Sequence, residues 1–143
     1  MMKVLLTAGF ALVLSAPTVA GDYVLKVSKI EAKKTPQSGD WSAGVSLRQK
    51  AEPDNRDSWH GGEGKFEGEG AVLPVDLELG GLDSGEPVTL FVGIDDDGED
   101  AGGDNAEDKL EIEFKVFSTR SKERVYDYAQ DDWSLRIHYT LEK

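Results

Sequence analysis

Alternation of apolar and polar residues with a period of two is the feature that most restricts how this chain can fold. Successive side chains of a β-strand point to opposite faces of its sheet, so such a segment offers one face to a core and one to water. The pattern occupies residues 73–79, 88–94, 110–116 and 133–141. Further strands are predicted at residues 23–30 and 43–50, with a short one at 124–128.

The segments between these strands are rich in Gly, Pro, Asp and Ser, and no segment has a convincing helical pattern. Short alternating strands joined by such turns are typical of a β-sandwich. The sequence therefore predicts an all-β fold, an antiparallel β-sandwich of about seven to eight strands. Pro74 interrupts one strand pattern and cannot donate a ladder hydrogen bond, so that strand is expected at an edge or with a bulge.

The first twenty of the 143 residues have a different character. Lys3 precedes the apolar run "VLLTAGFALVL", and small residues follow up to Ala20. This order is typical of a secretory signal peptide, and the run is too short to span a bilayer. We expect residues 1–20 to be a signal peptide and residues 21–143 to be a single domain, secreted or periplasmic after cleavage. A buried N-terminal strand or helix is the alternative.

Acidic residues outnumber basic ones, 28 to 16, which gives a net charge of −12. This charge disfavours nucleic acid and an anionic membrane as partners, and it favours solubility and cation binding. The chain has no Cys, so it has neither disulfides nor thiolate ligands.

Residues 95–108, "DDDGEDAGGDNAED", contain eight acidic residues and no basic one. Asp95 and Asp97 are two apart at the end of a predicted strand, so their side chains leave on the same face. The glycines that follow allow Asp104 or Asp108 to approach the same point. Calcium prefers about six to eight oxygen ligands. The segment is therefore either a calcium site or a solvated acidic loop. An EF-hand is excluded because Gly93 would occupy its first ligand position.

Four segments resemble those of the C2 domain, a β-sandwich of calcium- and lipid-binding proteins: "YVLKVSKIEAKK", "SGDWSAGVSLRQ", "VTLFVGIDDDGED" and "DDWSLRIHY". The resemblance covers most of residues 21–143. It implies a C2-like sandwich with calcium between the loops at one end. It assigns Asp95 and Asp97 as paired ligands, Asp104 as a third from the same loop, and Asp40 as a ligand from an earlier loop. The acidic loop lacks apolar or basic tip residues, so phospholipid binding is not expected.

These features favour a secreted, non-enzymatic calcium-binding module that acts as a monomer on an unknown protein, glycan or mineral surface. One alternative is a metal-free acidic structural or interaction protein. Another is a small hydrolase, which would need His60 or a carboxylate pair in a concave pocket, and no nucleophile motif supports it.

Two further expectations concern side chains near the predicted loops and on the first strand. Trp41 is interpreted as a core residue, whereas Trp59 is as well placed for exposure as for burial. Lys26, Lys29, Lys33 and Lys34 are interpreted as side chains that protect an exposed edge strand from pairing.

Overall fold

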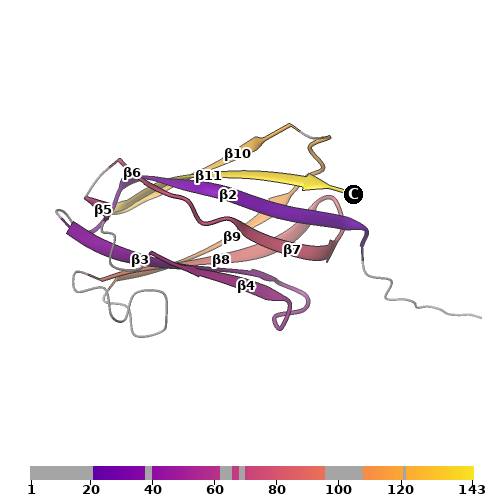
Figure 1. Ribbon diagram of the computed structural model, residues 1–143, viewed down its shortest axis with the longest axis horizontal. Coiled ribbons are helices and arrows are strands. Elements are labelled where there is room, and N and C mark those ends of the chain that lie inside the picture. The colour runs from indigo at the N-terminus through magenta and orange to yellow at the C-terminus, as the bar shows by residue number, and fades with distance from the viewer. Residues whose placement is uncertain (1–20, 38–39, 62–65, 68–69, 96–107, 121) are drawn as a thin grey trace, which may run out of the picture.

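The computed structural model describes residues 21–37, 40–61, 66–67, 70–95, 108–120 and 122–143. These residues form two antiparallel sheets that face each other, which confirms the predicted β-sandwich, and they include no helix (Figure 1). One sheet contains β2 (Tyr23–Lys34), β6 (Ala71–Leu73), β7 (Leu77–Leu82), β10 (Arg124–Gln130) and β11 (Trp133–Glu142). The other contains β3 (Asp40–Gln49), β4 (Arg56–His60), β5 (Phe66–Glu67), β8 (Glu86–Asp95) and β9 (Asp108–Val116).

The strand order connects segments that are far apart in the sequence. The first sheet runs β10-β11-β2-β6, with β7 also paired to β2, so the first and last long strands are neighbours. The second sheet runs β4-β3-β8-β9, with β5 paired to the start of β3. The sequence pattern did not predict β4 and β5, which lie in a region rich in turn residues.

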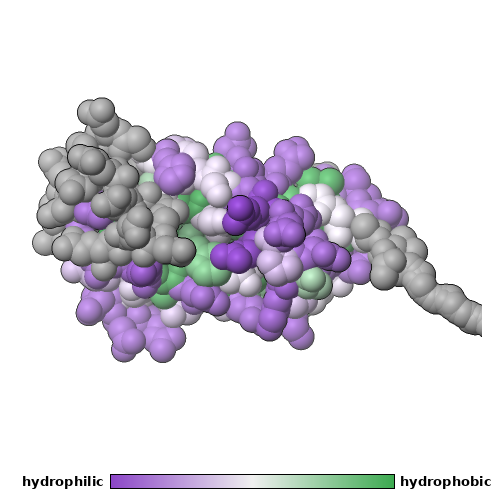
Figure 2. Space-filling view, turned by 90° about the horizontal axis from the view of Figure 1, so that it is seen from below, coloured by the Kyte–Doolittle hydropathy of each residue, from purple (hydrophilic) through white to green (hydrophobic). Residues whose placement is uncertain are grey.

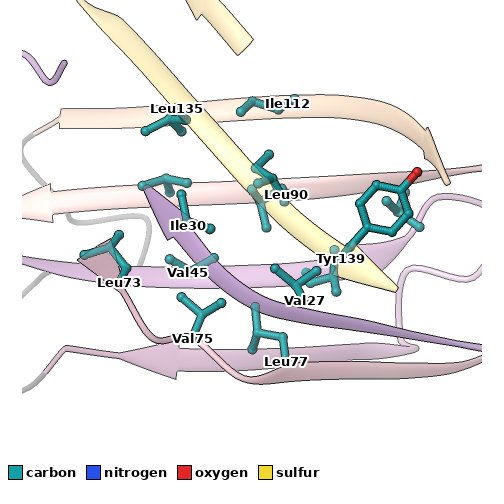
Figure 3. Packing of buried hydrophobic residues seen from close by; sticks show 14 of the residues in the cluster. Val27, Ile30, Val45, Leu73, Val75, Leu77, Leu90, Ile112, Leu135 and Tyr139 are labelled. Carbon is teal, nitrogen blue, oxygen red and sulfur yellow. The ribbon is translucent and has the colours of Figure 1, made fainter. Parts of the chain in front are cut away.

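The core lies between the sheets and is built from the apolar residues of the alternating pattern. Val45, Leu90 and Ile112 face Ile30 and Leu135 of the opposite sheet (Figure 3). All five are at most 2% exposed. Burying each such side chain contributes about 1.5–3 kcal/mol, so this layer supplies the main driving force for folding.

Pro74 marks the break between β6 and β7, which confirms the expectation of an irregular edge strand. The chain makes a short turn there, in which the Val75 amide donates to the Leu73 carbonyl at 2.9 Å and Asp76 has a φ of 47°. Both strands still pair with β2, and the side chains of Leu73 and Leu77 remain buried.

The expectation that the lysines protect an edge strand is wrong. β2 lies inside its sheet, between β11 on one side and β6 and β7 on the other. The exposed Lys26 and Lys33 therefore lie on the outer face of a central strand.

Candidate metal centre

One end of the sandwich gathers the strand ends that border the acidic segment. Ser42 near the start of β3 lies opposite Asp95 at the end of β8. Asp108 at the start of β9 lies opposite Ile94. In Figure 1 this is the end near the labels of β5 and β6. Asp95 and Asp108, the described residues that flank the acidic segment, thus lie on neighbouring strands.

Asp95 is the one predicted ligand whose side chain the structure describes. It ends β8 and is 7% exposed, beside Ser42, which is 1% exposed. Ile94 directly before it points into the core, so Asp95 lies on the outer face of the sheet. Because this carboxylate is shielded from water, a cation placed beside it would interact more strongly than in bulk solvent.

The segment between β2 and β3 is tied to the beginning of β9. Gln37 Nε2 donates to Asp108 Oδ2 at 2.7 Å, and Thr35 Oγ1 donates to the Gln37 carbonyl at 2.6 Å. The two contacts hold the approach to β3 against the point where the acidic segment ends. Sequence reasoning missed Gln37, because a glutamine among turn residues carries no signal of a partner 71 positions away.

The other predicted ligands are less completely described. Asp97 and Asp104 lie outside the described residues. Asp40 starts β3 and its backbone pairs with Glu67 of β5, while its side chain is outside the described part. Within the described part of the chain, no group of three or more His, Asp or Glu residues is arranged to hold a metal ion.

Two tryptophan side chains near this end pack against the core. Trp41 in β3 is fully buried, as predicted. Trp59 lies in β4, a strand that the sequence did not predict, and it is partly buried against the core.

The two histidines occupy different settings. His60 is exposed at the end of β4. His138 is 8% exposed and lies between two carboxylates, with Nδ1 at 2.9 Å from Glu123 Oε1 and Nε2 against Glu31 Oε2. Hydrogen bonding to His138 lowers the pKa of both Glu31 and Glu123.

This arrangement around His138 is structural. Because both ring nitrogens are engaged, no free nitrogen is available to act as a general base. Ser28 Oγ also donates to Glu123 Oε2 at 3.1 Å, which completes a cluster across β2, β11 and the segment before β10. Sequence reasoning missed the cluster, because it depends on β2 and β11 being neighbours.

Among the described residues, no helix is long and apolar enough to cross a membrane. Comparison with models of known protein families gives no match, and no curated protein sequence matches the chain.

Proposed function

We propose that this protein is a secreted or periplasmic, non-enzymatic, C2-like β-sandwich that binds calcium at the end marked by Asp95 and serves as a binding module. The observation that carries the proposal is the placement of a water-shielded carboxylate, Asp95, at the strand end from which an acidic segment departs. We assign Asp97 and Asp104 as further ligands from that segment, and Asp40 as a ligand from the start of β3.

The charge of the segment supports a cation there. Eight carboxylates and no basic residue occur within residues 95–108, so their mutual repulsion opposes a compact loop. A divalent cation would remove part of that repulsion and add direct oxygen ligation.

The register of the sheet supports the inclusion of Asp40. Ser42 lies opposite Asp95, and Asp40 precedes Ser42 by two residues on the same strand. The Gln37–Asp108 hydrogen bond further joins the segment before Asp40 to the end of the acidic segment. The start of β3 and the end of β8 thus lie at the same end of the sandwich, which supports Asp40 and Asp95 as ligands of one ion.

The net charge of −12 disfavours nucleic acid as a partner, and the acidic composition of residues 95–108 disfavours a lipid surface. A protein, glycan or mineral surface, approached by a monomer, fits the proposal. An acidic protein that uses its charge for solubility alone is the competing function.

A melting curve with and without calcium distinguishes these two functions. Extracellular calcium sites bind at about 10⁻⁴–10⁻³ M. With about 2 mM calcium and a dissociation constant near 0.1 mM, binding would stabilise the fold by about 1.8 kcal/mol. The proposal expects a higher Tm in calcium than in sodium chloride of matched ionic strength. Equal shifts in both salts would indicate charge screening alone.

The variant Asp95→Asn with Asp97→Asn should lose the calcium-specific shift. A matched control is Asp54→Asn with Asp83→Asn, which removes two exposed carboxylates at the opposite end of the sandwich and should keep the shift. A shift that survives the first double substitution would place calcium elsewhere.

A further inference from the structure

The outer face of the sheet formed by β4, β3, β8 and β9 carries a groove with a basic character on an acidic protein. The groove has a volume of about 380 Å³, and its lining includes Ser46, Arg48, Arg56, Ser58 and Phe91. Figure 2 shows this face, where strongly hydrophilic side chains adjoin a small hydrophobic patch. The volume is at the lower end of the range of about 300–1,000 Å³ typical of small-molecule sites.

Two arginines lie directly opposite each other in this groove. Arg48 of β3 and Arg56 of β4 are cross-strand partners. Directly opposite residues of an antiparallel pair have Cβ atoms about 4.5–5.5 Å apart, and like charges at such positions destabilise the sheet. Arg48 and Arg56 therefore repel each other, and a neutral residue in place of either one would make the folded state more stable.

Neither arginine is neutralised by a neighbouring carboxylate within the described part of the chain. The nearby Glu113 pairs with Lys50 at 2.8 Å. Asp57, adjacent to Arg56, instead accepts from the backbone amides of Ser58 and Glu78. No ion pair joins a described acidic residue to either guanidinium, although the chain has 28 acidic residues.

An aromatic ring orients one of the two guanidinium groups. The Arg48 Cζ atom lies 4.2 Å from the centroid of the Phe91 ring. The Nε atom of Arg48 is buried and has no hydrogen-bond partner among the described residues. Such orphaned donors are rare in folded proteins and call for an explanation. Arg48 is thus held in place by stacking, while its charge remains uncompensated.

The remaining lining residues suit a hydroxylated ring. The Oγ atoms of Ser46 and Ser58 lie 3.5 Å apart and offer donors and acceptors. One row further along the strands, Gly44 lies opposite Gly93, so the floor there has no side chains and allows a flat ligand to approach the backbone.

We propose that this groove binds an acidic saccharide whose carboxylate or sulfate group sits between Arg48 and Arg56. Planar guanidinium groups recognise such oxyanions through paired hydrogen bonds. An extended peptide fits less well, because strand addition needs a free sheet edge and the groove crosses the central strands β3 and β8.

The two arginines are distant from the candidate metal centre, although the floor of the groove at Gly93 ends two residues before Asp95. Arg48 lies opposite Thr89, and Asp95 is six residues further along β8, about 20 Å away at the usual rise of a strand. Recognition of an oxyanion by Arg48 and Arg56 therefore does not require calcium, and it can be measured in the presence of a chelator.

Calorimetric titration of residues 21–143, which contain both sheets, tests the proposal at low ionic strength with EDTA present. The probes are an oligogalacturonate, a sulfated oligosaccharide and a neutral galactose oligomer of the same length. We expect binding of one or both acidic probes and none of the neutral one. The preferred acidic probe identifies the oxyanion as carboxylate or sulfate.

Arg56→Gln is the decisive variant, since Arg56 is exposed and its loss relieves a like-charge contact. It should weaken binding by about tenfold or more while the Tm stays the same or rises. Arg124→Gln, an equal charge change at an exposed position on β10, should bind like the wild type. The proposal is overturned if no acidic probe binds at millimolar concentration, if Arg56→Gln binds normally, or if inorganic phosphate or a polyglutamate peptide binds as tightly as the saccharide.

Discussion

Two groups of charged side chains, one on the outer face of each sheet, differ in whether a described group of opposite charge contacts them. On the sheet of β10, β11 and β2, His138 contacts Glu31 and Glu123, and Arg136 contacts Asp127 through two hydrogen bonds of 2.8 and 3.3 Å. On the sheet of β4 and β3, two arginines face each other without a described carboxylate partner.

Charged side chains that contact a group of opposite charge stabilise the fold, whereas charged side chains without such a contact can interact with a ligand. Paired groups contribute to stability and would lose that contribution if a ligand took one partner. Unpaired groups of one sign weaken the fold slightly, and binding an ion of the opposite sign relieves that cost. In sequence, residues 95–108 likewise contain charges of one sign only, eight carboxylates and no basic residue.

The largest effect on stability is expected from replacing His138, on the outer face of the sheet of β10, β11 and β2. His138→Ala deletes a buried ring and leaves Glu31 and Glu123 without their shared partner. We expect the free energy of unfolding to fall by about 2 kcal/mol, as measured by urea denaturation at neutral pH. His138→Gln, whose amide can still donate to one carboxylate, should lose less. Wild-type stability in both variants would contradict a structural role for the cluster.

Acid should weaken the contacts of His138 with Glu31 and Glu123. Because hydrogen bonding to His138 lowers the pKa of Glu31 and Glu123 below 4.5 in the folded state, the unfolded chain binds more protons than the folded chain in acid. Their contribution is complete above pH 4.5 and is lost as the pH falls through the lowered values. Unfolding free energy measured against pH should fall more steeply below pH 4.5 in the wild type than in His138→Ala. Parallel curves would show that His138 is not the cause.

The smallest effects should differ in sign between the two faces. Arg136→Gln breaks an exposed ion pair and should lower the Tm slightly, since such pairs contribute little. Arg56→Gln removes one of two like charges and should leave the Tm unchanged or raise it, by a few tenths of a kcal/mol in stability. Thermal melts of the two variants in one buffer provide the comparison. A clear loss of stability in Arg56→Gln would mean that this arginine has a structural partner.

The sequence predicted the sandwich because alternation reports directly which side chains are buried, as Leu90 and Ile112 illustrate. It missed β4 and β5 because turn residues surround them, and it did not predict which strands are neighbours. The lysines of β2 suggested an edge strand, and the contact between Glu31 and His138 could not be foreseen. The Arg48–Arg56 pair likewise requires the register of β3 and β4.

For the candidate metal centre, spacing alone identified the strand end at Asp95, which the structure places in a shielded position. Local sequence could not reveal the Gln37–Asp108 contact, because it joins two segments that meet only after the sheets assemble. Composition likewise could not distinguish a ligand from a solvated carboxylate, because that distinction depends on the three-dimensional arrangement of the side chains.

We propose above that the acidic segment of residues 95–108, whose sequence contains no basic residue, binds calcium at the end of the sandwich marked by Asp95. Calorimetric titration of residues 21–143 with calcium tests it most directly. We expect saturable binding at about 10⁻⁴–10⁻³ M that is lost in Asp95→Asn with Asp97→Asn and retained in Asp54→Asn with Asp83→Asn. Absence of calcium binding by the wild-type protein at millimolar concentration would contradict it.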